Sequence, residues 1–189
     1  MRRALTLLAL TGLLLPAAPA QDAPAPPRPR TVAGVSFTPP TDAGWVEEPA
    51  ANRMRAAQYR LPRAEGDSED GELVVFHFGG GGGSVEDNLD RWISQFRQPD
   101  GGSSKAAAKL ERRDVGGLAA HVIELAGTYV AETRPGAGER VNKPGWRLLG
   151  AIVETPAGPF FVKLVGPAAT VQAARPAFTR FVESFRATS

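Results

Sequence analysis

The sequence predicts an α+β fold: a mostly antiparallel sheet of about six to eight strands with helices on both faces. Three observations support this prediction. Short segments rich in β-branched and aromatic residues follow one another, and the turns between them are too short for parallel crossovers. One segment, 145–155, is apolar at both even and odd positions, as in a strand covered on each side. Two further segments, 85–96 and 171–185, repeat apolar residues at helical spacing.

The first 20 residues have the pattern of a secretory signal peptide. Arg2 and Arg3 precede an apolar run, 4–15, and Ala18-Pro19-Ala20 supplies small residues at a cleavage site. We therefore expect cleavage before Gln21 and export to the periplasm or the extracellular space. The residues after the Arg pair do not extend a twin-Arg signature, which favours ordinary secretion. The apolar run is shorter than the roughly 20 residues that span a bilayer, so we expect no transmembrane segment after leader removal.

A proline-rich segment, 21–30, follows the leader and reads QDAPAPPRPR. Prolines lack amide donors and favour extended conformations, so we expect a solvated linker, with a proline-rich ligand for a partner domain as the alternative. Residues 31–189 are then expected to form a single α/β sandwich domain. A chain of that length buries about 70% of its unfolded surface.

Charge and composition narrow the possible functions. The chain has 22 Lys and Arg against 20 Asp and Glu, but Arg2 and Arg3 belong to the leader, and the rest is balanced at 20 to 20. A nucleic-acid surface needs clustered basic residues, so we expect no nucleic-acid partner. The chain contains no Cys, which excludes disulfides, thiol catalysis and Cys-ligated metal sites. The sequence calls for no cofactor and leaves the oligomeric state undetermined.

The first expected strands are short. Segments 31–37 and 45–47 flank a turn-rich stretch, and 53–61 forms a third strand that Pro62 ends. The acidic stretch 63–72 does not match the ligand spacing of an EF-hand, so we expect a solvated hairpin loop and no metal site there.

A strand, a glycine loop and a helix form the most distinctive local unit. Residues 73–78 read LVVFHF, as in a strand covered on both faces. Five glycines follow, and Ser84 then stands at the N-cap of an amphipathic helix that we expect to end near Pro99.

Two hairpins and a helix complete the domain. Segments 105–115 and 118–129 are joined by Gly116-Gly117, which suits a two-residue turn. Segments 145–155 and 160–165 form the second hairpin. The last helix carries a strong apolar stripe, and we expect Pro176 to kink or break it.

Candidate site residues surround the central unit. A glycine loop before a helix is a natural anion site, but this one lacks the phosphate-loop and dinucleotide-binding fingerprints; a flexible turn or close backbone packing is the alternative. Asn88 and Gln95 lie on one side of the helix and line a polar pocket or fix a loop. Arg147 and Lys163 occupy odd positions in adjacent strands, where they meet on one face or serve as exposed edge charges. The candidates for binding are Gly79, Gly80, Gly81, Gly82, Gly83, His77, Asn88, Gln95, Arg147 and Lys163.

No catalytic residue is indicated. His77 and His121 are the available imidazoles, and His121 shares strand parity with apolar residues, which favours a structural role. No Ser lies in a Gly-x-Ser-x-Gly setting. We therefore expect a protein that is not an enzyme, with an unrecognised hydrolase as the last alternative.

The order of elements resembles a group of uncharacterised exported bacterial proteins with a PsbP-like α/β/α sandwich. The resemblance is carried by Phe76-His77-Phe78-Gly79, by Asn88-x-x-Arg91-Trp92-x-x-Gln95-Phe96, and by the 149–155 hairpin with Gly166-Pro167 before the last helix. It implies a fold and no catalytic or metal residue.

These observations together predict an exported, non-catalytic domain that binds a protein partner or a cell-envelope component. The alternative is a small-molecule or anion-binding protein that uses the loop 79–83.

Overall fold

The computed structural model of the chain describes residues 27–133 and 136–188. The predicted signal peptide, 1–20, and residues 21–26 of the predicted linker lie outside the described residues.

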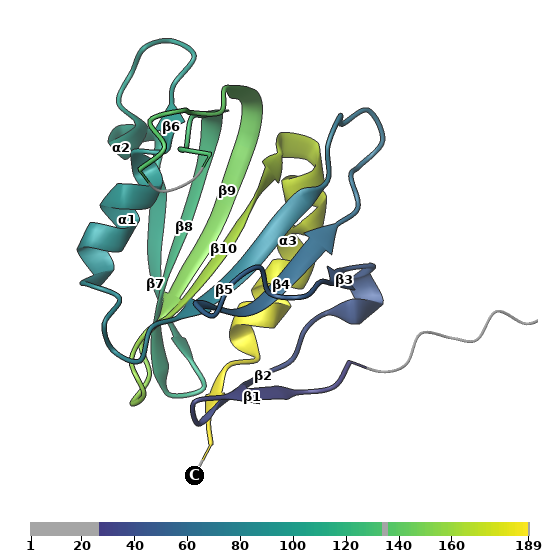
Figure 1. Ribbon diagram of the computed structural model, residues 1–189, viewed down its shortest axis with the longest axis vertical. Helices are drawn as coiled ribbons and strands as arrows, with labels where there is room; N and C mark the ends of the chain where they lie inside the picture. Colours follow the sequence, from purple (N-terminus) through teal and green to yellow (C-terminus); the bar gives the residue numbers. More distant parts are fainter. Residues whose placement is uncertain (1–26, 134–135, 189) are drawn as a thin grey trace, which may run out of the picture.

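An antiparallel sheet forms the centre of the molecule (Figure 1). In the described part of the chain it has eight strands, and every pairing in it is antiparallel, which confirms the predicted fold class. In spatial order the strands are β3 (Val46–Glu47), β4 (Arg55–Leu61), β5 (Gly71–His77), β10 (Phe160–Pro167), β9 (Lys143–Val153), β8 (Leu118–Tyr129) and β6 (Phe96–Arg97), with β7 (Lys109–Val115) also paired to β8.

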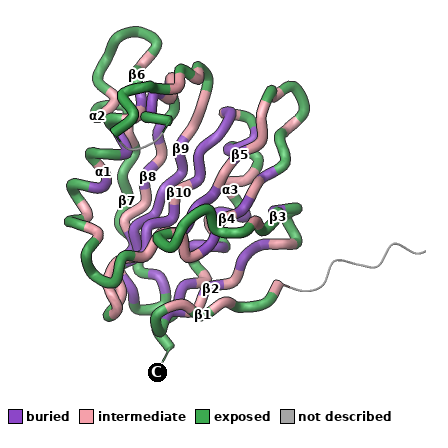
Figure 2. Tube along the Cα trace, viewed as in Figure 1, coloured by how far each residue is buried: buried purple, intermediate pink, exposed green. Residues whose placement is uncertain are grey.

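Helices lie on opposite faces of this sheet, as predicted (Figure 1). Helix α3 (Ala168–Glu183) packs Phe178 and Phe181 onto one face, and α1 (Val85–Ile93) packs Trp92 onto the other. The interior strands are therefore buried on both sides, and Figure 2 shows the buried positions concentrated in β10, β9 and β8. A sheet covered on both faces explains why 145–155 is apolar at both parities.

Both predicted hairpins form. Gly116 (φ 60°) and Gly117 (φ 82°) make the two-residue turn between β7 and β8. β9 and β10 pair along their length, from Val153 with Phe160 to Trp146 with Pro167.

Several boundaries differ from the expectations. The segment 31–37 is two strands, β1 (Arg30–Val32) and β2 (Val35–Phe37), because Ala33 (φ 47°) and Gly34 (φ 73°) reverse the chain. Helix α1 ends at Ile93, before Phe96 joins the sheet. A short helix, α2 (Ser104–Ala107), and a 3-10 turn, η1 (Thr41–Ala43), were not predicted. Helix α3 is not broken at Pro176, and its backbone stays helical through that residue.

A small second sheet joins the two ends of the described chain. β2 pairs with β1 on one side and with β11 (Arg186–Ala187) on the other. Phe37 of β2 stacks on Phe185, with ring centroids 5.0 Å apart. The small sheet therefore packs, through Phe37, against the same apolar core that α3 covers. None of the helices in the described residues is both long and apolar enough to cross a membrane.

Candidate functional site

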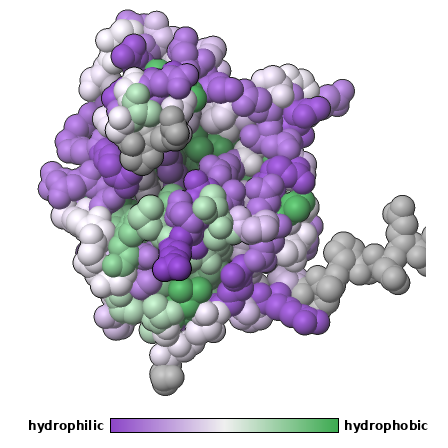
Figure 3. Space-filling model, viewed as in Figure 1, coloured by the Kyte–Doolittle hydropathy of each residue, from purple (hydrophilic) through white to green (hydrophobic). Residues whose placement is uncertain are grey.

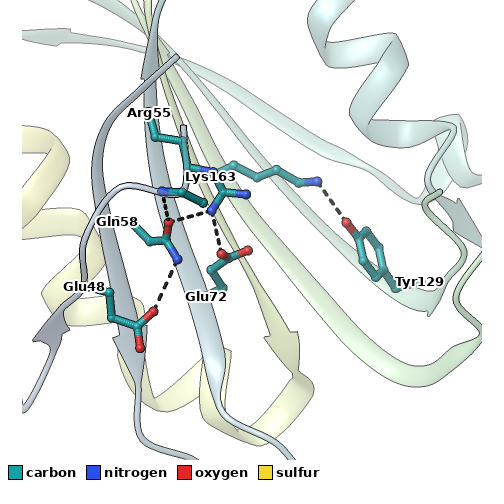
Figure 4. Close-up of polar contacts among 7 residues, drawn as sticks. Glu48, Arg55, Gln58, Glu72, Tyr129 and Lys163 are labelled. Atoms are coloured by element: carbon teal, nitrogen blue, oxygen red, sulfur yellow. Dashed lines mark hydrogen bonds and ion pairs between the residues drawn. The ribbon is translucent and has the colours of Figure 1, made fainter. Parts of the chain in front are cut away.

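Lys163 interrupts the apolar face that α1 covers. It lies in the middle of β10, between Phe161 and Val165, which both belong to the α1 core. Its Nζ donates to Gln95 Oε1 at 2.5 Å. It also donates to Tyr129 Oη at 3.2 Å (Figure 4) and lies 5.1 Å from the centre of the Tyr129 ring. In the described part of the chain, no carboxylate forms an ion pair with this amine. Stability does not explain a lysine at this position, because a protein with an apolar side chain here would have a higher free energy of unfolding.

Electrostatics favour the neutral form of this amine. Burial lowers the pKa of Lys163 to about 7, and repulsion from Arg91 adds to the effect. Glu72 opposes the shift, but its carboxylate receives a hydrogen bond from Arg55 at 2.8 Å (Figure 4). Arg55 also donates to Gln58, which donates to Glu48. Glu72 is thus engaged in a separate network on β4 and β5.

An open cavity of about 320 Å³ lies beside Gln95 and Tyr129. Its charged groups are Arg91, Arg140 and Glu132, and Arg140 lies 3.9 Å from Glu132. Arg91 is held in place because it donates to Asn88 Oδ1 at 2.7 Å. The lining residues come from the C-terminal end of α1, the end of β8 and the segment after it: Arg91, Ser94, Gln95, Tyr129, Ala131, Glu132 and Arg140. We call this cavity the Lys163 cleft. Lys163 does not line the cavity itself but bonds to Gln95 and Tyr129, which do. Among the described lining residues two arginines face one glutamate, so these residues together carry a positive charge.

The glycine loop has packing contacts of its own. A Cβ on Gly82 would lie 2.5 Å from Phe161 Cε2, and one on Gly158 would lie 2.5 Å from the Gly80 amide nitrogen. The amide of Asn88 donates to Gly82 O at 2.7 Å and to Ser84 O at 2.9 Å. Close backbone approach therefore explains glycine at position 82, and Asn88 fixes the loop onto α1. Gly79, Gly80 and Gly83 adopt positive φ, and Gly81 does not.

His77 and Arg147 lie away from the cleft, on the α3 side of the sheet. His77 stacks on Phe160 with ring centroids 4.3 Å apart. Arg147 pairs with Glu124 and donates to Gln172 of α3 at 2.9 Å. The expectation that Arg147 and Lys163 meet on one face is wrong. In the observed antiparallel register Lys163 pairs with Gly150, so odd positions of β10 share a face with even positions of β9.

Sequence reasoning missed Tyr129, Arg91 and Arg140. Arg91 and Gln95 are four residues apart, and such residues share one helix face. That spacing was a usable signal. No sequence pattern indicates that Tyr129 and Arg140 belong to the site, because they come near Arg91 and Gln95 only when β8 and the segment after it fold against the end of α1. In the described residues no three His, Asp or Glu side chains converge as a metal site would require.

Comparison with known proteins bears on the fold. Cyanobacterial PsbP (CyanoP) from Synechocystis sp. PCC 6803 superposes with a TM-score of 0.52, covering 90% of this chain and 98% of that one at 15% identity. The fold is PsbP-like. A Pseudomonas aeruginosa protein of unknown function has a TM-score of 0.43 at 14% identity, covering 84% of this chain and 94% of its own. No protein-family model matches the sequence, and no curated protein matches it closely enough to count as a relative. At these identities the likeness shows the fold alone.

Proposed function

We propose that the protein is an exported, non-catalytic binding protein that holds a small ligand bearing a carboxylate or phosphate group in the Lys163 cleft. One observation carries the proposal: a buried lysine in a central strand is held by two neutral partners, Gln95 and Tyr129, and both partners line an open cleft whose described lining has two arginines and one glutamate. Perturbed ionisable groups of this kind gather at functional sites.

The cleft offers the donors that an anion needs. Arg91 and Arg140 present guanidinium groups, which match the planar geometry of carboxylate and phosphate. Ser94 and Tyr129 add hydroxyl groups to the same cavity. Glu132 is the one opposing charge among the described lining residues, and its contact with Arg140 is long, at 3.9 Å. An anion that replaces this weak contact gains charge-assisted hydrogen bonds.

The non-catalytic part of the proposal rests on the histidines. His121 contacts Glu154 at 2.8 Å, and His77 packs on Phe160; neither lines the cleft. The imidazole that most often serves as a general base is therefore not among the described lining residues of the cavity.

Thermal unfolding with added ligands tests the proposal. Inorganic phosphate and acetate should raise the melting temperature of the wild-type protein above that in chloride of equal ionic strength, because a ligand that binds the native state stabilises it. Arg91→Gln and Arg140→Gln should lose most of this increase. Arg112→Gln, which removes an exposed arginine of β7 outside the cleft, should keep it. Equal responses of all three variants, or no response of the wild type to either anion, would refute the proposal.

A protein partner is the second candidate, favoured by exposed apolar side chains. Figure 3 shows apolar side chains gathered on the lower part of the viewed face. Met54 is 53% exposed and Phe78 is 37% exposed. Phe78 stacks on Phe76, and Met54 O accepts a hydrogen bond from the amide of His77, so both lie at the end of β5. Recovery of the same envelope protein by the wild type, but not by Met54→Gln with Phe78→Ser, would support this candidate.

A further inference from the structure

We infer that Lys163 is a carbonyl-reactive lysine, and that the Lys163 cleft takes a small 2-oxo acid whose carboxylate lies against Arg91 and Arg140 while its carbonyl carbon condenses with the Lys163 amine as an imine. The inference rests on the proposed function and deepens it by naming the ligand class.

The contacts of Nζ suit a neutral amine. A neutral amine has two N–H donors and one lone pair. One N–H goes to Gln95 Oε1 at 2.5 Å and the other to Tyr129 Oη at 3.2 Å, which leaves the lone pair of a neutral amine without a hydrogen bond to either group. Burial raises the pKa of Tyr129 to about 12, so its phenol keeps its proton at neutral pH. Both partners of the amine in the described structure are uncharged, whereas a buried ammonium group usually has a carboxylate partner.

The groups that act on Lys163 come from helix α1, the turn after it, β8 and β5. Helix α1 contributes the positive charge of Arg91, the turn after it contributes the neutral amide of Gln95, and β8 contributes Tyr129. The carboxylate of Glu72 on β5 forms no ion pair with Lys163, and it is already bonded to Arg55. With a pKa of about 7, about half of the lysine is free amine at neutral pH. Desolvation beside a second cation is a recognised way to activate a lysine nucleophile.

The ligand reaches the amine from the open side. Gln95 and Tyr129 both line the cavity, and Nζ lies directly behind them. Gln95 is partly exposed, so its amide can turn aside and leave the amine facing the ligand. A carboxylate held at the arginines places the adjacent carbonyl on the Lys163 side of the cleft.

The chemical step balances without an oxidant or a reductant. The Nζ lone pair forms a bond to the carbonyl carbon, and the carbonyl oxygen takes a proton from Tyr129. Tyr129 recovers a proton from the nitrogen, which yields a neutral carbinolamine. The carbinolamine then loses its hydroxyl group together with the proton of its remaining N–H as water, and the nitrogen lone pair forms the C=N bond, so one amine and one carbonyl give one imine and one water.

Reductive trapping tests the inference. The full chain is incubated with pyruvate and cyanoborohydride, and the adducts are located by mass spectrometry of the intact protein and its peptides. We expect one adduct, at Lys163, and a labelling rate that falls about tenfold for each pH unit below the pKa, because the free-amine fraction falls in that way. Lys163→Arg and Lys163→Met should both abolish it. Lys105→Arg, which changes an exposed lysine paired with Asp90, should not.

A second probe separates this inference from the proposed function. Propanal carries a carbonyl but no carboxylate, so Arg140→Gln should slow labelling by pyruvate and leave labelling by propanal unchanged. If phosphate and pyruvate stabilise the protein but Lys163 reacts no faster than Lys105, the inference is wrong and the proposed function stands. If Lys163 is labelled selectively by propanal while no anion stabilises the protein, the proposed function is wrong and the lysine reactivity stands alone.

Discussion

Lys163 makes the stability of the protein depend on pH in a direction opposite to that of a salt-bridged lysine. Its pKa is about 7 in the folded protein and 10.5 in an ordinary setting, so between these values the unfolded chain binds more protons. The free energy of unfolding contributed by this group therefore rises with pH from about 7 to about 10, and this contribution is lowest below pH 7.

Lys163→Met is the corresponding test. Methionine fills the same space without a buried charge, so the variant should be more stable than the wild type near neutral pH, and its advantage should shrink toward about pH 9.5. Urea unfolding at about pH 6.5, 8 and 9.5 measures the difference. Lys105→Met, an exposed control, should differ from the wild type by a constant amount. A constant difference for Lys163→Met as well would contradict the low pKa.

Gly150 shows how closely α1 approaches the sheet. A Cβ at this residue would lie 2.6 Å from Trp92 Cζ3 and 2.8 Å from Ile123 Cγ2. Gly150→Ala should therefore cost about 1–3 kcal/mol of unfolding free energy, through overpacking. Gly81→Ala is the matched control, since its Cβ would have Phe78 O at 3.4 Å as its nearest atom, and its φ is not positive. Denaturant unfolding of both variants measures the costs, and similar losses would argue against this packing.

Single residues of the candidate site were predictable only where the signal was local. Gln95 is predicted from its helical spacing with Asn88, and Lys163 from its odd position in the strand next to Arg147; the structure joins Gln95 and Lys163 at 2.5 Å. Arg147 was misplaced because strand register, which parity along one strand does not reveal, decides which face it shares. Tyr129 carried no such pattern, so its part in the site emerges only from the fold.

At the scale of elements, helix α1 depends on its cap. Ser84 Oγ accepts a hydrogen bond from the Asp87 amide at 3.0 Å, as the sequence predicted for an N-cap. Ser84→Ala should cost about 1 kcal/mol of unfolding free energy. Ser68→Ala changes an exposed loop serine and should stay within about 0.5 kcal/mol of the wild type. Thermal or denaturant unfolding of the two variants checks the difference; equal effects would show that the cap is not needed.

Long, periodic elements were predicted well, and short ones were not. β8, β9, β10 and α3 appear close to their expected bounds, because each buries a regular pattern of apolar residues. β6, β11 and α2 have between two and four residues each, too few to show a period. β6 exists because Phe96 and Arg97 pair with Tyr129 and Thr128, a contact between distant parts of the chain. Helix formation through Pro176 likewise reflects packing, since Ala177 and Phe178, the two residues that follow it, are buried.

At the scale of the whole molecule, the arrangement of layers followed from the sequence, whereas the order of strands did not. A strand apolar at both parities required cover on each face, and α1 and α3 supply it. Placing β5 beside β10 joins segments more than 80 residues apart, as in the pair Phe160 and His77. No local pattern encodes such a neighbour, and that neighbour determines which side chains surround Lys163.

Export remains a prediction that concerns the whole chain. When the full chain is produced in a bacterial host, we expect the mass of the exported protein to correspond to a chain that begins at Gln21, since small residues precede that position. Ala20→Lys should block the cleavage and leave the longer chain. Retention of Met1 in a protein found only in the cytoplasm would contradict the prediction.

The small sheet has a consequence for how the chain can be reconnected. β1 and β11 flank the same strand, β2, with Arg186 opposite Ser36 and Arg30 opposite Phe37. A linker of a few residues would therefore be long enough to join the start of β1 to the end of β11. A short linker from the end of β11 to the start of β1 would close the polypeptide into a ring, and new termini opened at the exposed Gly116-Gly117 turn would give a circular permutant with the same layers.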